Sequence, residues 1–407
     1  MKKNRWLLLA ASIVANLCTG SAYAWSVFSL PLQEKFGWTA TQVNLAYSIY
    51  LGMIPFAVII AGKLQDKFGP RWVIFAGGLI FGIGTFLLSF TSTTIWLYFT
   101  YGILGGIGIG FIYGSTIPNT TKWFPDKKGL AGGIITGGFG IGAMIFGPLS
   151  ASLIERIGIL ATFRYEGIAY LIIIGIVSQY ITAPPKGYKP EGWEPPAPAP
   201  GVVSTAAVDL TPGQMLRTPI FWILFAMYTL ACFAGLMIIG NASPIGQEQV
   251  GMSAAAAAGA VGFLSLGNTL GRVFWGWVSD VIGRFASLLI MYSISAVALF
   301  GLINASTYWP FIISVMIVAA CFGGFFGIFP ALTADNFGLN NLGVNYGVLF
   351  ISYGIAGVIA PTLAAYLKEA SGGGYSLPLT IALVVNILGA LLTVVYKKMS
   401  TPKIGSD

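Results

Sequence analysis

The sequence predicts an all-α integral membrane protein with twelve transmembrane helices, six on each side of a polar middle segment. Of its 407 residues, 56% are hydrophobic and only 8% are charged, whereas about a quarter of a typical soluble domain is charged. Apolar runs that are long enough to cross a bilayer, about 20 residues each, recur along the chain. The stretch 184–218 is too rich in proline and charge to form another span.

The apolar runs place the helices in order along the chain. The first six are expected at residues 6–32, 43–62, 72–92, 95–118, 129–153 and 164–183. The second six are expected at residues 219–241, 254–278, 286–305, 308–333, 343–367 and 376–396. The sequence therefore predicts an N-terminal six-helix bundle (1–183), a loosely ordered cytoplasmic linker (184–218) with some extended polyproline character, and a C-terminal six-helix bundle (219–407).

Composition also excludes several classes of site. The three cysteines lie singly in apolar stretches, which gives neither a disulfide framework nor a metal site. The chain has no histidine, so the usual general base and metal ligand is missing. Its net charge of +8 is spread over short loops and tails and not gathered in a patch. We expect no cofactor, no metal and no nucleic-acid partner.

Lysine and arginine gather at one set of predicted helix ends. The other set carries only Lys35, Arg156, Arg164 and Lys368. Because cytoplasmic loops of membrane proteins are enriched in basic residues, this asymmetry predicts a multi-pass protein of the cell inner membrane with both termini and the linker in the cytoplasm.

The N-terminus allows a second interpretation. A basic start, an apolar run and the sequence AYA at 22–24 imitate a secretory signal peptide with its cleavage site. The apolar run continues past that site to Leu32, which is long enough to span a bilayer. We therefore interpret this segment as the first transmembrane helix.

Arg272 is the charged residue that cannot be placed at a helix end, in a loop or in a tail. It lies near the middle of the expected helix 254–278, where a charge costs roughly 2.5–3.5 kcal/mol on insertion scales. The alternative is a structural role, in which Arg272 forms a permanent ion pair with a buried acid, but we expect no Asp or Glu in the membrane interior. Asn268 precedes Arg272 by one helical turn and shares its face. A guanidinium group suits a carboxylate ligand, which it can bind through two hydrogen bonds.

Two matching segments follow the second and the eighth expected helices. Residues 62–71 read GKLQDKFGPR, and residues 276–284 read GWVSDVIGR. Each has a glycine, an aspartate four positions later, a second glycine three positions further and then a basic residue. The acid and the base can pair across helix ends in one conformation and separate in another. The predicted gating residues are Asp66, Lys67, Arg71, Asp280 and Arg284.

These two segments resemble the signature loop of the major facilitator superfamily. Residues 113–133, YGSTIPNTTKWFPDKKGLAGG, resemble the oxalate:formate exchanger and monocarboxylate transporter branch of that family, and GSAYAW at 20–25 is similar too. The likeness to this branch, and to its prokaryotic lactate-type members, covers nearly the whole chain except the linker. It implies the major facilitator fold, with two six-helix halves and a central substrate site.

The resemblance also assigns further substrate-binding residues. It implies that Tyr23, Tyr113, Phe322 and Phe326 face the cavity, where phenols bind a carboxylate and aromatic faces shield its apolar end. In oxalate carriers of the family a second cation lies on the eleventh helix, and that position here is Tyr353. One central cation balances one negative charge, which favours a monoanion such as lactate, pyruvate or formate.

We therefore expect a transporter of a small monocarboxylate, such as L-lactate, that works by alternating access with proton symport and is a monomer in the bilayer. Two features leave the proton route open: animal relatives carry an acid where this chain has Asn268, and no histidine is present. The alternative is an anion exchanger of the oxalate:formate type. An enzyme would need a nucleophile and base, a metal cluster or paired carboxylates, which we do not find. A sensor that binds the anion without moving it is a third hypothesis.

Overall fold

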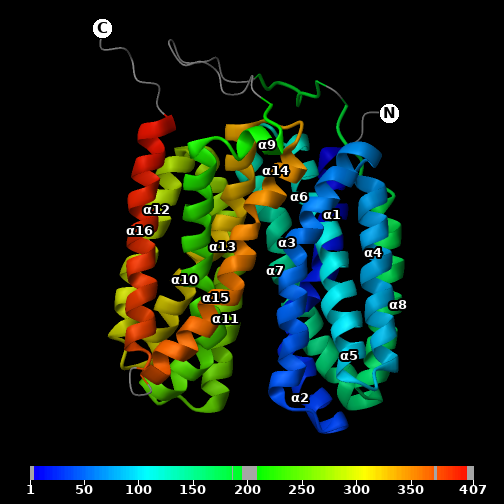
Figure 1. The fold of residues 1–407 in the computed structure, drawn as a ribbon, viewed down its shortest axis with the longest axis vertical. Coiled ribbons are helices and arrows are strands. Elements are labelled where there is room, and N and C mark those ends of the chain that lie inside the picture. The colour runs from blue at the N-terminus through cyan, green and yellow to red at the C-terminus, as the bar shows by residue number, and fades with distance from the viewer. Residues whose placement is uncertain (1–3, 186, 195–208, 371–373, 401–407) are drawn as a thin grey trace. The chain divides into compact units, whose positions relative to one another are not determined.

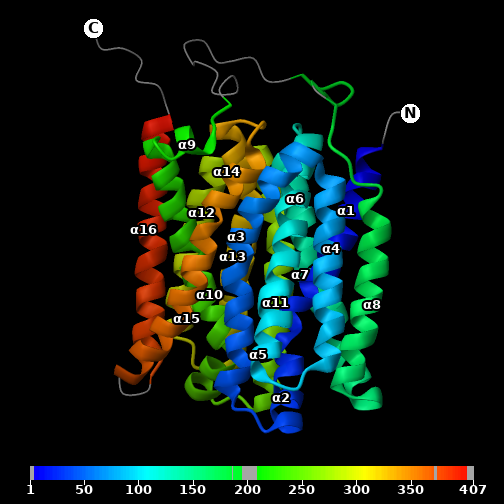
Figure 2. The same cartoon turned by 45° about the vertical axis from the view of Figure 1, so that its right-hand side comes forward.

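A computed structural model describes residues 4–185, 187–194, 209–370 and 374–400. All regular secondary structure in these ranges is helical (Figure 1, Figure 2). Eleven helical segments among the described residues are long and apolar enough to cross a membrane. Helix α11, which is 29 residues long and carries Arg272, is not one of these eleven. The prediction of an all-α membrane protein is confirmed.

The first six predicted spans are helical, but short irregular helices divide two of them and end a third. The elements are α1 (Arg5–Thr19), η1 (Gly20–Ala24), α2 (Trp25–Phe36), α3 (Ala40–Phe68), α4 (Pro70–Leu87), η2 (Leu88–Phe90), α5 (Thr94–Leu97), η3 (Tyr98–Gly105), α6 (Gly106–Trp123), α7 (Lys128–Ile157) and α8 (Ile159–Ser178). Segments η1 and η2 are 3₁₀-helices, whereas η3 is a π-helix of eight residues.

The second six predicted spans are helical as well. The elements are α9 (Pro212–Met215), α10 (Pro219–Val250), α11 (Ala254–Ile282), α12 (Arg284–Ile303), α13 (Tyr308–Phe337), α14 (Leu342–Leu349), α15 (Ile351–Ala370) and α16 (Ser376–Ser400). The four-residue helix α9 lies in the predicted linker, and residues 195–208 of that linker lie outside the described ranges.

Local sequence explains where the helices that carry the repeated segments begin and end. Helix α3 begins at a capping box, in which Thr39 and Gln42 satisfy each other's backbone N–H groups. It continues to Phe68 and α11 to Ile282, so the predicted ends at 62 and 278 are too early. The next residues are Gly69 (φ 81°) and Gly283 (φ 88°), whose backbone conformation favours glycine. Both repeated aspartates therefore lie on the last turns of helices.

Contacts between Cα atoms divide the chain into two compact units. The first unit comprises Met1–Pro125, Ile135–Pro190 and Leu339–Gly354. The second unit comprises Asp126–Ile134, Glu191–Gly338 and Ile355–Asp407. Helix α7 thus begins in the second unit and continues in the first. The boundaries predicted from chain order, at 183 and 219, stay a prediction.

Each unit has its own apolar core. In the first unit α3 packs on α6 and α4 packs on α8, and a core cluster includes Trp25, Phe28 and Phe163. In the second unit α11 packs on α13 and α12 packs on α16. Both views show α4 beside α8 and α12 beside α16 (Figure 1, Figure 2). These cores hold the helices that carry the candidate functional residues.

Candidate functional site

Arg272 is buried inside the second unit, with 1% of its surface exposed. Its Nε donates a hydrogen bond to Oδ1 of Asn268, one turn earlier on α11, at 3.0 Å. Its Cζ lies 4.7 Å from the centroid of the Phe326 ring on α13. The amide and the ring orient the guanidinium group, and the ring adds a cation–π attraction.

Glycines let the backbone of neighbouring helices approach Arg272 closely. A Cβ atom at Gly323 of α13 would lie 2.0 Å from the carbonyl oxygen of Asn268, and one at Gly271 would lie 2.0 Å from that of Ala320. A Cβ atom at Gly133 of α7 would lie 2.1 Å from the carbonyl oxygen of Arg272 itself. Small residues at helix interfaces allow such packing in membranes. The Arg272 backbone is therefore enclosed on two sides.

The structure brings four of the predicted substrate-binding residues together in the second unit. Phe322 and Phe326 are buried on α13, with ring centroids 5.1 Å apart in an edge-to-face arrangement. Phe326 is the ring that covers Arg272. The Tyr228 ring of α10 meets Phe326 at 5.9 Å. An arginine, an amide and aromatic rings in one place can hold a carboxylate and cover the apolar part of a small anion.

Two further predicted residues, Tyr113 and Tyr353, lie in the first unit and share a neighbour. Both are buried. The ring of Phe350 is 5.5 Å from that of Tyr113 and 5.0 Å from that of Tyr353. Phe350 was not predicted, although residues three positions apart on a helix lie on the same face, so its spacing from Tyr353 could have indicated it. Tyr23 belongs to η1, but its side chain lies outside the described part of the structure.

The repeated segment of the second unit forms a network of charges at the start of α7. Asp280 accepts hydrogen bonds from the backbone N–H groups of Gly129 (2.9 Å) and Leu130 (2.7 Å). It also pairs with Arg284 at 2.7 Å. A carboxylate at a helix N-terminus is favoured by the helix dipole. The predicted acid–base pair of this segment is thus present, together with a contact to α7 that was not predicted.

Asp335 of α13 extends this network. It pairs with Lys128 at 2.6 Å and with Nε of Arg284 at 3.3 Å. Sequence reasoning missed both Lys128 and Asp335 as members of the network. Nothing in their local sequence indicates that α13 ends beside the start of α7, so only the tertiary fold connects them.

The repeated segment of the first unit has different partners. Asp66 pairs with Lys122 of α6 at 3.4 Å. The Arg71 guanidinium donates to the side chain of Gln179, and Lys67 lies 5.1 Å from the ring centroid of Phe68. The two segments therefore share a backbone shape at Gly69 and Gly283 but not a charge network.

Glu166 corrects the expectation that no acid lies in the membrane interior. It belongs to α8 and is 5% exposed. The hydroxyl group of Ser150 on α7 donates to its Oε1 at 2.5 Å. Among the described residues no lysine or arginine pairs with Glu166. It is therefore not the fixed ion-pair partner of Arg272.

The chain matches the family model described as Major Facilitator Superfamily over residues 9–303 and 229–406. It is 34% identical to the uncharacterized MFS-type transporter YhjX of Escherichia coli K12 over 362 residues, which are 88% of this chain and 87% of that protein. It is 30% identical to the oxalate:formate antiporter of Oxalobacter formigenes over 404 residues, 98% of this chain and 93% of the other.

Two more distant similarities agree with this match. Monocarboxylate transporter 12 of Mus musculus is 23% identical over 392 residues, covering 90% of this chain and 80% of that protein. The crystal structure of the transporter FucP in the outward conformation superimposes with a TM-score of 0.74 at 15% identity. That superposition covers 97% of this chain and 99% of FucP, and it supports the fold.

Proposed function

This chain belongs to the Major Facilitator Superfamily, and we propose that it carries a small monocarboxylate anion, such as L-lactate, by alternating access together with a proton. The protein is a multi-pass membrane transporter and not an enzyme. One observation carries the proposal of an anionic substrate: Arg272 is buried in α11, oriented by Asn268 and covered by Phe326.

Charge balance supports a monoanion as the substrate. A guanidinium group binds a carboxylate through two parallel hydrogen bonds, and one bound carboxylate neutralises one arginine. Nε of Arg272 donates to Asn268, and the terminal N–H groups of a guanidinium are the donors that form such a fork. The relatives named oxalate:formate antiporter and monocarboxylate transporter 12 support a small carboxylate as the chemical class.

The contacts of the substrate extend beyond Arg272. Phe322 and Phe326 shield the apolar end of the anion, and Asn268 keeps the arginine in place. We retain Tyr113, Tyr353 and Tyr23 as substrate contacts on the sequence argument. No cofactor or metal takes part, and the carrier works as a monomer in the inner membrane.

The basic residues give the proposed orientation, with both termini and the linker in the cytoplasm. On the cytoplasmic side, Asp280 pairs with Arg284 and accepts a hydrogen bond from the start of α7. In the proposed transport cycle this contact is part of the gate. Transport requires this contact to form and to break. Asp66, Lys67 and Arg71 act at the corresponding place in the first unit.

Anion exchange is the second candidate, because the chain is 30% identical to an oxalate:formate antiporter over nearly its whole length. An exchanger needs an anion on the opposite side and ignores an imposed pH gradient. A symporter of a monoanion and a proton moves no net charge and responds to that gradient.

Uptake of labelled L-lactate into proteoliposomes tests these proposals. We expect an inward proton gradient to drive uptake by the wild type and Arg272→Ala to abolish it, since alanine carries no charge to bind the anion. Uptake that persists in Arg272→Ala would refute the site. Uptake that requires internal anion would establish exchange, and binding without uptake would establish a sensor.

A further inference from the structure

Glu166 is a buried carboxyl group for which the Arg272 site provides no role. It lies seven residues after Ile159, the first residue of α8, which places it about 10 Å along the helix at 1.5 Å per residue. Its partner among the described residues is the Ser150 hydroxyl group on α7. An acid at this depth without a cation is a candidate for reversible protonation.

The surroundings of Glu166 favour its neutral form. Taking an ionised carboxylate out of water costs several kcal/mol when no cation pairs with it, whereas one hydrogen bond to a charged group contributes roughly 1.5–3 kcal/mol. Arg164, on the same helix, is exposed, and its guanidinium group lies 5.8 Å from the Phe90 ring. The other titratable groups around Glu166 are uncharged phenols and a thiol: Tyr170 on α8, Tyr50 on α3, Tyr101 on η3 and Cys18 on α1.

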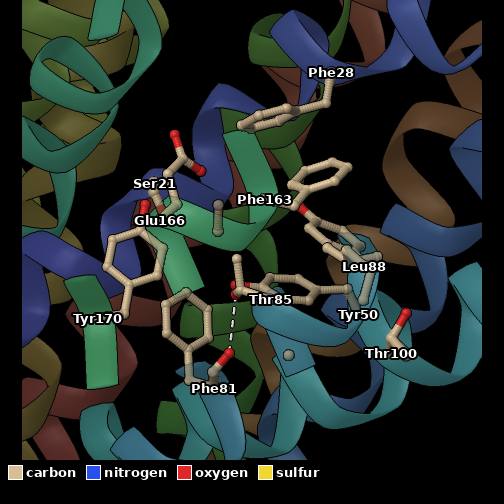
Figure 3. A pocket seen from close by; sticks show the side chains of 13 residues that line it. Ser21, Phe28, Tyr50, Phe81, Thr85, Leu88, Thr100, Phe163, Glu166 and Tyr170 are labelled. Carbon is tan, nitrogen blue, oxygen red and sulfur yellow. Dashed lines mark hydrogen bonds between the residues drawn. The ribbon is translucent and has the colours of Figure 1, made fainter. Parts of the chain in front are cut away.

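A small cavity lies beside Glu166. Figure 3 shows Ser21, Glu166 and Tyr170 along one side of it and Phe28, Phe163 and Leu88 along the other. The space open to the centre of a water molecule is about 20 Å³. A water molecule needs roughly 10–15 Å³ by this measure, together with polar partners. The cavity is thus large enough for one water molecule next to the carboxyl group.

All three irregular segments of the first unit form part of the cavity wall, and Leu88 is the contribution of the 3₁₀-helix η2. Ser21 comes from the 3₁₀-helix η1, and Thr100 and Tyr101 come from the π-helix η3. Segments of π-helix are rare and occur frequently at functional sites. The Tyr101 ring packs on Trp25 at 4.1 Å and on Tyr50 at 4.8 Å.

The hydroxyl group of Tyr101 is a second polar group beside the cavity. The oxygen of Tyr101 is buried and has no hydrogen-bond partner among the described residues. Buried polar groups are normally hydrogen-bonded, to protein or to ordered water. The cavity thus combines the Glu166 carboxyl group, the Tyr101 hydroxyl group and room for a water molecule. These features suit it to accepting and releasing a proton.

We propose that Glu166 binds the coupled proton and that the adjoining cavity connects it to water; this inference rests on the proposed proton-coupled transport. A proton leaves hydronium and binds Oε2, the carboxylate oxygen that Ser150 does not engage. The carboxylate becomes a neutral acid, and on release the proton returns to water. No other bond is made or broken.

This assignment gives a physical reason for coupling. The second unit holds a buried cation at Arg272, and the first holds a buried carboxyl group at Glu166. When the anion and the proton are both bound, each buried charge is neutralised. When only the anion is bound, the ionised carboxylate of Glu166 stays buried with no cation paired to it among the described residues, which costs several kcal/mol. The carrier loaded with the anion alone is therefore less stable than the fully loaded carrier, and this favours binding of the anion and the proton together.

Proteoliposomes loaded at a pH one unit above that of the external medium test the inference with labelled L-lactate. Electroneutral symport concentrates the anion inside by about tenfold per pH unit, since both correspond to about 1.4 kcal/mol. We expect wild type and the exposed control Glu155→Gln to reach this ratio. Glu166→Gln keeps the shape of a neutral acid but cannot release a proton, so we expect its ratio to stay near one while exchange of labelled for unlabelled anion persists.

Ser150→Ala provides a second variant that keeps the acid. It removes the hydrogen bond that stabilises the ionised carboxylate, so the pH of half-maximal uptake should move upward. An unshifted profile, or a tenfold ratio in Glu166→Gln, would overturn the assignment of Glu166 and leave the proposed function intact. Wild-type uptake that ignores the gradient would instead refute proton coupling itself, and the assignment with it.

Discussion

Replacing Arg272 by lysine separates the geometry of the site from its charge. Lysine keeps the positive charge but cannot donate from Nε to Asn268, a bond of 3.0 Å in the structure, and cannot present two parallel donors to a carboxylate. Loss of one hydrogen bond to a charged group is worth roughly 1.5–3 kcal/mol. Since 1.4 kcal/mol corresponds to a factor of ten, we expect anion affinity to fall about 10- to 150-fold.

The assay is equilibrium binding of labelled L-lactate to purified Arg272→Lys in detergent, followed by its uptake kinetics in proteoliposomes. Arg217→Lys is the matched control, because Arg217 is exposed and precedes α10. We expect the control to bind as the wild type does. An Arg272→Lys variant with wild-type affinity would show that the site needs a positive charge alone, and the argument from the guanidinium fork would be wrong.

Two further predictions concern packing and the charge network. Gly323→Ala places a methyl group 2.0 Å from the Asn268 carbonyl oxygen. We expect this variant to lose roughly 1–3 kcal/mol of stability, measured as a lower Tm. Gly262→Ala is the control, because a methyl group there has nothing within 4 Å, and it should not lower the Tm. Asp280→Asn removes the charge at the start of α7 and should lower stability by up to about 2 kcal/mol and slow uptake. Asp66→Asn breaks one ion pair, at 3.4 Å, and should lower stability by at most about 1 kcal/mol. Equal losses of stability in Asp280→Asn and Asp66→Asn would refute the conclusion that the two repeated segments differ in their charge networks.

The length of each apolar run was sufficient to predict the helices but not their internal irregularities. The expected helix 95–118 is observed as α5, η3 and α6, with a π-helical segment over Tyr98–Gly105. A π-helix shifts backbone hydrogen bonds without changing the apolar pattern, so periodicity does not reveal it. Here the Tyr101 ring packs between those of Trp25, the first residue of α2, and Tyr50 of α3. Only the tertiary fold supplies these contacts.

A small error in one helix boundary explains why Glu166 was missed. The predicted start at 164 placed it in the first turn, where an acid is solvated and favoured by the helix dipole. The helix begins instead at Ile159, after Gly158 with φ 80°, so Glu166 lies one turn and a half deeper and is buried. Arg272 was easier to predict, because long apolar stretches on both sides exclude any helix end near it.

The two buried charged residues together limit the charge of the substrate. If Glu166 is neutral in the loaded carrier, the single guanidinium group of Arg272 is left to balance the anion. A dianion would then carry one negative charge without a counterion among the apolar rings of Phe322 and Phe326, at a cost of several kcal/mol. A monoanion leaves no such charge. The proposed selection for monocarboxylates therefore follows from the charge of Arg272, and the aromatic rings need only accommodate the size of the apolar end.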